Sequence, residues 1–87
     1  MIKFPLKFEA YSESDSNIKS TWNCKSNAKT PILSTIPVEF SGNATGYNAE
    51  ELFALSLINC IIGEIKYNCD KQNESFKSIN GRAIFMK

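Results

Sequence analysis

The chain contains no histidine, and this absence excludes several kinds of active site. Histidine is the side chain that ordinarily titrates near neutral pH, so a Ser-His-Asp or Cys-His relay cannot be built from these 87 residues. The cysteines, Cys24, Cys60 and Cys69, are odd in number and include no CxxC pair. Neither a disulfide framework nor a zinc site with thiolate and imidazole ligands is therefore indicated. We expect no metal and no cofactor.

Strong charge and long apolar runs are also missing. Ten Lys plus Arg residues against nine Asp plus Glu leave a formal net charge of +1, too little to attract nucleic acid or anionic lipid. The first twelve residues lack the apolar core of a signal peptide, and the longest nearly apolar run, residues 52–62, is too short to span a bilayer. We therefore expect a cytoplasmic protein without nucleic-acid or membrane partners.

The composition is that of a folded chain of small size. Hydrophobic residues make up 43% and charged residues 22%, close to the averages of soluble globular proteins, which predicts one domain over residues 1–87. A chain this short buries only about 60 to 65% of its unfolded surface on folding. It is therefore marginally stable alone, and a partner subunit would stabilise it.

The first third of the sequence alternates between apolar and polar residues. This pattern occurs in residues 2–10 and again in residues 18–24, and it predicts two strands that pair as an antiparallel hairpin around a turn at 12–17. Pro5 donates no hydrogen bond, so we expect the first strand at a sheet edge.

A short strand and a loop follow. Residues 31–38 are rich in β-branched side chains but lie between two prolines, which predicts only a short strand. In the loop at residues 40–47, Gly42 and Gly46 are expected to adopt positive φ.

A helix is predicted from residue 49 to about 71. Asn48 followed by Glu51 resembles a capping box, and Glu50 adds negative charge in the first turn, where the helix dipole favours it. Such a helix would be roughly 34 Å long. Its first half is apolar nearly all round up to Ile62, so we expect it to be buried on most sides.

The last segment, residues 76–85, predicts a β-hairpin with its turn at Asn80-Gly81. The sequence therefore predicts an α+β fold: N-terminal antiparallel strands, then a long buried central helix, then a β-hairpin.

Cys60 lies in the middle of the apolar part of the predicted helix. A cysteine in such a place is commonly a small buried hydrophobe, and a reactive thiol at mid-helix would need a cation from another segment. Ser56, one turn earlier, is expected to bond the helix backbone. Gly63 costs about 1 kcal/mol relative to alanine inside a helix, which suggests close approach by another backbone or a ligand.

Two neighbouring stretches precede and include this cysteine: Ile36-Pro-Val-Glu-Phe-Ser-Gly42, and Gly46-Tyr-Asn-Ala-Glu-Glu-Leu-Phe-Ala-Leu-Ser-Leu-Ile-Asn-Cys60. Together they resemble the OsmC/Ohr family of peroxide-reducing thiol proteins. In that family a P-x-E-F-x-G stretch, a glycine-rich loop and the start of a helix precede a reactive cysteine on that helix. The resemblance implies an OsmC-like fold in an intertwined homodimer. It also implies a thiol peroxidase that reduces organic hydroperoxides with a thiol reductant, in the oxidative stress response.

The resemblance also implies roles for particular residues. Cys60 corresponds to the peroxidatic cysteine and Glu50 to the carboxylate that helps orient the family's arginine. On one continuous helix these two residues would be roughly 15 Å apart and about 80° out of phase, so their cooperation requires a second subunit or a break in the helix. An apolar pocket near Phe53, Leu57 and Ile61 would favour lipid-like hydroperoxides.

The chain departs from the family pattern in two main ways. The family's early arginine has no match, because the single arginine is Arg82; Lys19 and Lys25 are candidate substitutes. The matched region corresponds to about the first half of the family's domain, so the second helix and the resolving cysteine are not present. The alternative is therefore a non-enzymatic OsmC-fold dimerisation module with inert cysteines. A third hypothesis, a small-molecule carrier, lacks an identifiable set of polar specificity residues.

Overall fold

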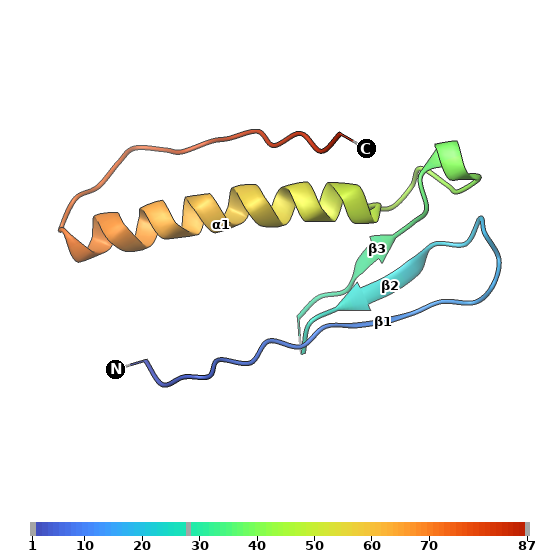
Figure 1. Ribbon diagram of the computed structural model, residues 1–87, viewed down its shortest axis with the longest axis horizontal. Helices are drawn as coiled ribbons and strands as arrows, with labels where there is room; N and C mark the ends of the chain where they lie inside the picture. Colours follow the sequence, from blue (N-terminus) through green and yellow to red (C-terminus); the bar gives the residue numbers. More distant parts are fainter. Residues whose placement is uncertain (1, 28, 87) are drawn as a thin grey trace. The chain divides into compact units, whose positions relative to one another are not determined.

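The structure, a computed structural model, describes residues 2–27 and 29–86 and has the expected α+β composition. In chain order it contains strands β1 (Tyr11–Glu13), β2 (Trp22–Lys25) and β3 (Ile32–Ser34), the short 3-10 turn η1 (Val38–Phe40) and helix α1 (Ala49–Lys71) (Figure 1). The chain falls into two compact units, residues 1–49 and 50–87. The first unit contains the sheet, and the second contains nearly all of α1 and the C-terminal segment.

The three strands form an antiparallel sheet in the order β1-β2-β3. The predicted hairpin is therefore present, but the predicted first strand is wrong, because residues 2–10 carry no strand and β1 begins only at Tyr11 and extends into the expected turn at residues 12–17. In the observed register Tyr11 pairs with Lys25, and directly after Lys25 the chain turns, with the Lys29 N–H donating to the Ser26 carbonyl at 3.0 Å. Residues 2–10 thus lie beyond the end of β2 and have no strand opposite them. Alternation alone does not make a strand when no partner offers its backbone groups.

The loop that connects β3 to α1 is closed by backbone hydrogen bonds. Tyr47 N–H donates to the Leu33 carbonyl at 2.8 Å, and Thr35 N–H donates to the Tyr47 carbonyl at 2.9 Å, so the two ends of the loop lie side by side. Inside the loop the Thr35 hydroxyl donates to the carbonyl of Asn43. Thr35 is 4% exposed, which makes it one of the few buried side chains in the first unit.

The loop glycines are required for space and not for an unusual backbone. Neither Gly42 nor Gly46 has a positive φ, so that prediction is wrong; Ser41 is left-handed instead, with φ 71°. A Cβ on Gly42 would lie 1.8 Å from the Ile36 carbonyl oxygen, and one on Gly46 would lie 2.8 Å from the Leu33 carbonyl oxygen. The backbone passes too close at both positions to accommodate a side chain.

Helix α1 occupies Ala49–Lys71, as predicted. It ends in a Schellman motif: Glu74 N–H donates to the Cys69 carbonyl at 2.8 Å and Asn73 N–H to the Asp70 carbonyl at 3.2 Å. Asn73 takes the left-handed conformation, with φ 55°, at the position where glycine is commonest.

The predicted C-terminal hairpin is wrong, because residues 72–86 contain no strand. Within the second unit this segment instead runs back along α1 (Figure 1). Its Phe85 ring meets Phe53 of α1 edge to face, with centroids 5.3 Å apart, and a Cβ on Gly81 would come within 2.5 Å of the Ile58 side chain. The apolar residues of the segment therefore contact the helix and not one another.

A hydrophobic core is missing from the described residues. Every hydrophobic side chain there is at least partly exposed, and the buried polar side chains are those of Ser34 and Thr35. Helix α1 contains no buried residue. The burial expected for this helix is therefore not provided by the single chain, and burial in a dimer stays a prediction.

Helix α1 meets the criteria of length and composition for crossing a membrane. It is the one such helix among the described residues, and its most apolar 18-residue window has a mean hydropathy of 1.2. We expected no membrane span because the apolar run at residues 52–62 is too short to cross a bilayer. The whole helix, however, has 23 residues. Core helices of soluble proteins meet the same criteria, so the cellular location stays a prediction.

Candidate functional site

Cys60 lies at the middle of α1 and is exposed. It belongs to a row of exposed side chains spaced three or four residues apart, which places them on one side of the helix. We call this row the Cys60 stripe; its members are Phe53, Leu57, Cys60, Glu64 and Tyr67. The three large apolar members are 51%, 50% and 54% exposed, in chain order. On the opposite side, the half-buried helix residues are Ala54, Ile58, Ile62 and Cys69.

The predicted substrate-contacting residues lie beside the thiol. Phe53 and Leu57 belong to the Cys60 stripe, and Ile61 follows Cys60 directly at its margin, 53% exposed. The helix thus brings all three predicted residues to one apolar surface around the sulfur. Half-exposed side chains do not enclose a ligand, so a pocket would need further walls from outside this surface.

The Ser56 hydroxyl does not bond the thiol. It donates to the Phe53 carbonyl of its own helix at 2.7 Å, as expected from the sequence. No hydrogen bond or ion pair described for residues 2–27 and 29–86 involves the Cys60 sulfur.

Glu50 and Cys60 are not brought together within one copy. Glu50 lies in the first turn of α1, and the helix is continuous from there to Cys60. The two residues are therefore separated by about 15 Å along the axis and by about 80° around it. On such a continuous helix, Glu50 and Cys60 can cooperate only if they belong to different subunits.

The candidate cations are spread over both units. Lys19 and Lys25 lie in the first unit and Arg82 lies in the second, where its side chain is exposed. None of the described interactions joins any of the three to Cys60. Among the described residues, no group of three or more His, Cys, Asp or Glu could hold a metal ion.

The other two cysteines are less accessible. Cys24 is half-buried on β2, where its sulfur lies 3.1 Å from the Ser34 hydroxyl oxygen and 3.6 Å from the Ile32 carbonyl oxygen. Cys69 is half-buried near the end of α1, and all three cysteines are free thiols. Cys60 is therefore the most accessible of the three in the single chain.

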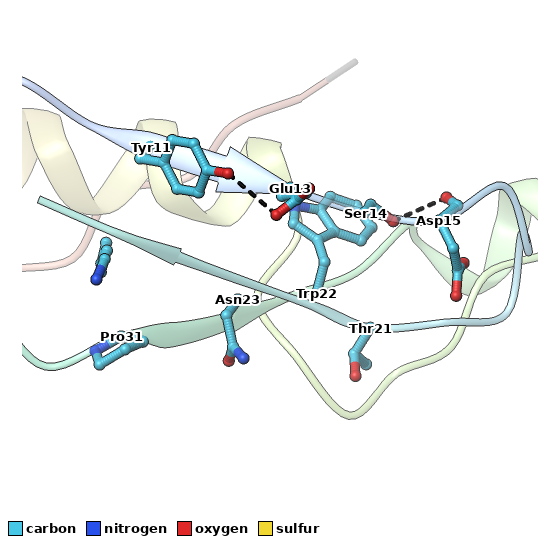
Figure 2. A pocket seen from close by; sticks show the side chains of 9 residues that line it. Tyr11, Glu13, Ser14, Asp15, Thr21, Trp22, Asn23 and Pro31 are labelled. Atoms are coloured by element: carbon cyan, nitrogen blue, oxygen red, sulfur yellow. Dashed lines mark hydrogen bonds between the residues drawn. The ribbon is translucent and has the colours of Figure 1, made fainter.

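The first unit contains a cleft that the sequence did not indicate. Figure 2 shows the residues that line this cavity, which lies along β1, β2 and the turn that joins them. Its volume is about 450 Å³. It is lined by aromatic, acidic and amide side chains: Tyr11, Glu13, Ser14, Asp15, Thr21, Trp22, Asn23, Lys25 and Pro31. The sequence feature that could have indicated this cleft is the acidic turn at residues 12–17, which has Tyr11 before it and Trp22 after it.

The acidic groups of this cleft are engaged with their own loop. The Tyr11 hydroxyl donates to Glu13 at 3.0 Å, and this bond together with the carboxylate's charge raises the pKa of Tyr11 above 10.0. The Asp15 carboxylate accepts from the Asn17 N–H at 3.0 Å and from the Ser20 hydroxyl at 3.4 Å. These bonds stabilise the turn between β1 and β2. They give the two carboxylates a structural role, so no bound ligand is needed to explain their presence.

Comparison with known proteins adds no relative. No protein-family model matches this chain, and no curated protein or solved structure is detectably similar to it. The OsmC/Ohr resemblance therefore rests on the residues quoted above for it.

Proposed function

We propose that this chain is an OsmC-like thiol peroxidase that reduces organic hydroperoxides through Cys60. One observation supports the proposal most: the sulfur is exposed at the centre of an apolar helix surface, beside Phe53, Leu57 and Ile61. Such a surface accommodates the hydrocarbon part of an alkyl or lipid hydroperoxide better than hydrogen peroxide, which has no apolar group to bury.

The reaction assigned to Cys60 is a two-electron oxidation of sulfur. The thiolate attacks the terminal oxygen of the hydroperoxide, an S–O bond forms, and the O–O bond breaks. The organic fragment leaves as an alkoxide, takes up a proton and becomes an alcohol, while the cysteine becomes a sulfenic acid. An external dithiol then reduces the sulfenic acid: one of its thiols attacks the Cys60 sulfur and releases water, and its second thiol displaces Cys60, so the cysteine returns to the thiol and the reductant is oxidised to a disulfide.

A second copy of the chain is part of this proposal. The half-exposed side chains around Cys60 need further walls before they can exclude water, and α1 needs a partner to bury its apolar residues. A role for Glu50 also depends on such an assembly, because Glu50 cannot reach the sulfur within its own copy.

Turnover of cumene hydroperoxide with a dithiol reductant tests the proposal. We expect Cys60→Ser to abolish turnover, while the matched variants Cys24→Ser and Cys69→Ser keep at least half of it. Turnover that survives Cys60→Ser would contradict the assignment, and so would a wild-type chain that assembles but does not consume the hydroperoxide.

The second outcome would favour the alternative, a non-enzymatic OsmC-fold dimerisation module with inert cysteines. The observation behind that alternative is that the described residues bring no cation to the Cys60 sulfur. A mid-helix thiol gains little from the helix dipole, so without a cation its reactivity stays ordinary.

A further inference from the structure

We propose that Phe85 of the C-terminal segment determines substrate specificity: together with Phe53 it binds the far end of an unbranched hydrocarbon chain whose reactive end lies at Cys60. The inference rests on the proposed peroxidase function, whose substrate it narrows to hydroperoxides with a chain of about eight atoms. The residues that carry it all belong to the second unit.

Alternate residues of the C-terminal segment face α1, along which the segment runs (Figure 1). Phe85 meets Phe53 edge to face, and the backbone at Gly81 passes so close to the helix that a Cβ there would come within 2.5 Å of a helix side chain. Ile79 and Ala83, at the same alternating positions, are half-buried, whereas the residues between these four are exposed. The Phe85 ring is therefore the last of a row of contacts that hold the segment on α1.

Phe85 gives the Cys60 stripe a wall from outside the helix. Its ring is 44% exposed and that of Phe53 is 51% exposed, so the pair leaves apolar surface on both rings open to a ligand. Aromatic rings offer large apolar areas for burial. The aromatic pair is therefore a place where a hydrocarbon chain can leave water on two sides.

The spacing along α1 determines which chain fits. Phe53 precedes Cys60 by seven residues, or about 10 Å along the axis, and Leu57 lies between them, 50% exposed. An extended carbon chain, with bonds of about 1.5 Å and near-tetrahedral angles, advances about 1.25 Å per atom. A chain of about eight atoms therefore reaches from the sulfur to the aromatic pair.

Charge determines the direction of the chain. Glu64 follows Cys60 on the stripe at about 6 Å along the axis, so a hydrocarbon that pointed toward the end of α1 would meet a carboxylate. In the other direction the stripe is apolar as far as Phe53, and beyond it lies the acidic first turn with Glu50 and Glu51. The apolar track is thus bounded by charge at both ends, and it extends from the sulfur to the aromatic pair.

Alkyl methanethiosulfonates test the chain length without relying on peroxidase activity. The Cys60 thiolate attacks the sulfur that carries the alkyl group, an S–S bond forms, and methanesulfinate leaves. The full chain retains only Cys60, through Cys24→Ser and Cys69→Ser, and its labelling by the ethyl, butyl, hexyl, octyl and dodecyl reagents is followed by intact-protein mass spectrometry. Each rate is divided by the rate of the same reagent with N-acetylcysteine, which removes differences in intrinsic reactivity.

We expect the normalised rate to rise at least tenfold from the ethyl to the octyl reagent, because each added methylene is buried on the track. From octyl to dodecyl we expect less than a twofold rise, since the track ends at Phe53. Phe85→Ala should lower the octyl rate at least fivefold and change the ethyl rate by less than twofold. Met86→Ala is the matched control, because Met86 is 88% exposed, and it should leave both rates unchanged.

Two further variants separate binding of the chain from support of the segment. Phe85→Leu keeps an apolar side chain and is expected to retain at least half of the octyl rate, with the helix verified by circular dichroism. If Phe85→Ala unfolds the chain, Phe53→Ala serves in its place with the same expected loss, since it removes the other ring at a position where alanine favours the helix. A loss of equal size for the ethyl and octyl reagents would show that Phe85 only supports the segment, which would overturn the inference.

The inference would also be overturned by rates that do not depend on chain length, by a preference for octyl that survives Phe85→Ala, or by a rate that keeps rising to dodecyl. Its failure is distinguishable from that of the proposed function. Chain-length-dependent labelling without turnover of octyl hydroperoxide would contradict the proposed function and leave the binding role of Phe85 standing. Turnover with equal kcat/KM for ethyl and octyl hydroperoxide would contradict the inference and leave the proposed function standing.

Discussion

Gly42 and Gly46 show how two glycines can be required without any unusual backbone angle. Neither has a positive φ, yet the carbonyl oxygens of Ile36 and of Leu33 in β3 occupy the space where a side chain would start. The clash that a Cβ would make is closer at Gly42, at 1.8 Å, than at Gly46, at 2.8 Å. The two positions therefore form a graded pair for testing the closed loop between β3 and α1.

We expect Gly42→Ala to lower the free energy of unfolding by about 1 to 3 kcal/mol, because the added methyl displaces backbone. Gly46→Ala should cost less, since a smaller movement relieves its contact. Urea denaturation at one fixed protein concentration measures both. A Gly42→Ala variant as stable as the parent would show that the loop is not closed around this glycine.

The pKa of the Tyr11 hydroxyl depends on the charge of Glu13. The hydrogen bond from Tyr11 and the negative charge of the carboxylate both disfavour the tyrosinate, so the pKa of Tyr11 lies above 10.0. A folded-state pKa raised above the unfolded value contributes stability below about pH 10, and this contribution is lost as pH rises through the folded pKa. The exposed position of both groups keeps the contribution small.

We expect Glu13→Gln to move the ionisation of Tyr11 to lower pH, toward the ordinary value of 10.0. Ultraviolet absorbance during an alkaline titration measures tyrosinate, and Tyr11→Phe identifies the part of the curve that belongs to Tyr11. Superimposable curves for the parent and Glu13→Gln would contradict the contact.

Helix α1 and the C-terminal segment form one packed pair within the second unit. The edge-to-face contact of Phe53 with Phe85 lies near one end of this contact region, and Gly81 against Ile58 lies further along. Aromatic pairs of this geometry contribute about 0.5 to 1.5 kcal/mol beyond their buried area. The contact is the main described anchor for the last residues of the segment.

We expect Phe85→Ala to accelerate amide hydrogen exchange in residues 82–86 by about two- to tenfold, because it removes this anchor. Met86→Ala is the matched control, since Met86 is 88% exposed and has little packing to lose. Equal exchange in both variants would show that the segment is not held by the ring contact.

The sequence predicted α1 better than the strands, for a physical reason. The start of α1 depends on nearby residues, with Asn48 and Glu50 at the first turn, and local signals of this kind can be read in order along the chain. A strand depends on a partner that lies elsewhere. Residues 2–10 alternate correctly but lie beyond the end of β2, and residues 76–85 contact α1 in place of pairing with each other.

The candidate site was predicted in part for the same reason. Helical periodicity is local, so the positions of Phe53, Leu57 and Ile61 on the helix relative to Cys60 follow from the sequence once the helix is given, whereas their role in binding a substrate stays a prediction. The exposure of these side chains depends on what else packs on α1, which no single-chain pattern specifies. The acidic cleft beside Trp22 was not predicted, because it depends on the register in which β1 and β2 pair.

The molecule as a whole has little of the buried apolar surface that ordinarily stabilises a fold. Among its described residues no hydrophobic side chain is buried, and hydrophobic burial is the main favourable contribution to folding. Folding of such a chain should therefore be coupled to assembly. Proteins of this kind have a stability that depends on their own concentration.

We expect the melting temperature of the wild-type chain to rise by about 3 to 6 °C for each tenfold increase in concentration, because unfolding would also dissociate the proposed dimer. Circular dichroism between low micromolar and high micromolar concentration measures this. A melting temperature that stays constant over a hundredfold range would show that the single chain is stable alone.

Selective oxidation of one sulfur tests the account most directly. The native chain would be exposed to a limiting amount of cumene hydroperoxide, its sulfenic acids trapped with dimedone and its free thiols blocked, and the product at each cysteine quantified by peptide mass spectrometry under reducing and non-reducing conditions. We expect at least tenfold more oxidation at Cys60, as sulfenic acid or disulfide, than at Cys24 or Cys69. Equal oxidation at all three cysteines, or none at Cys60, would contradict it.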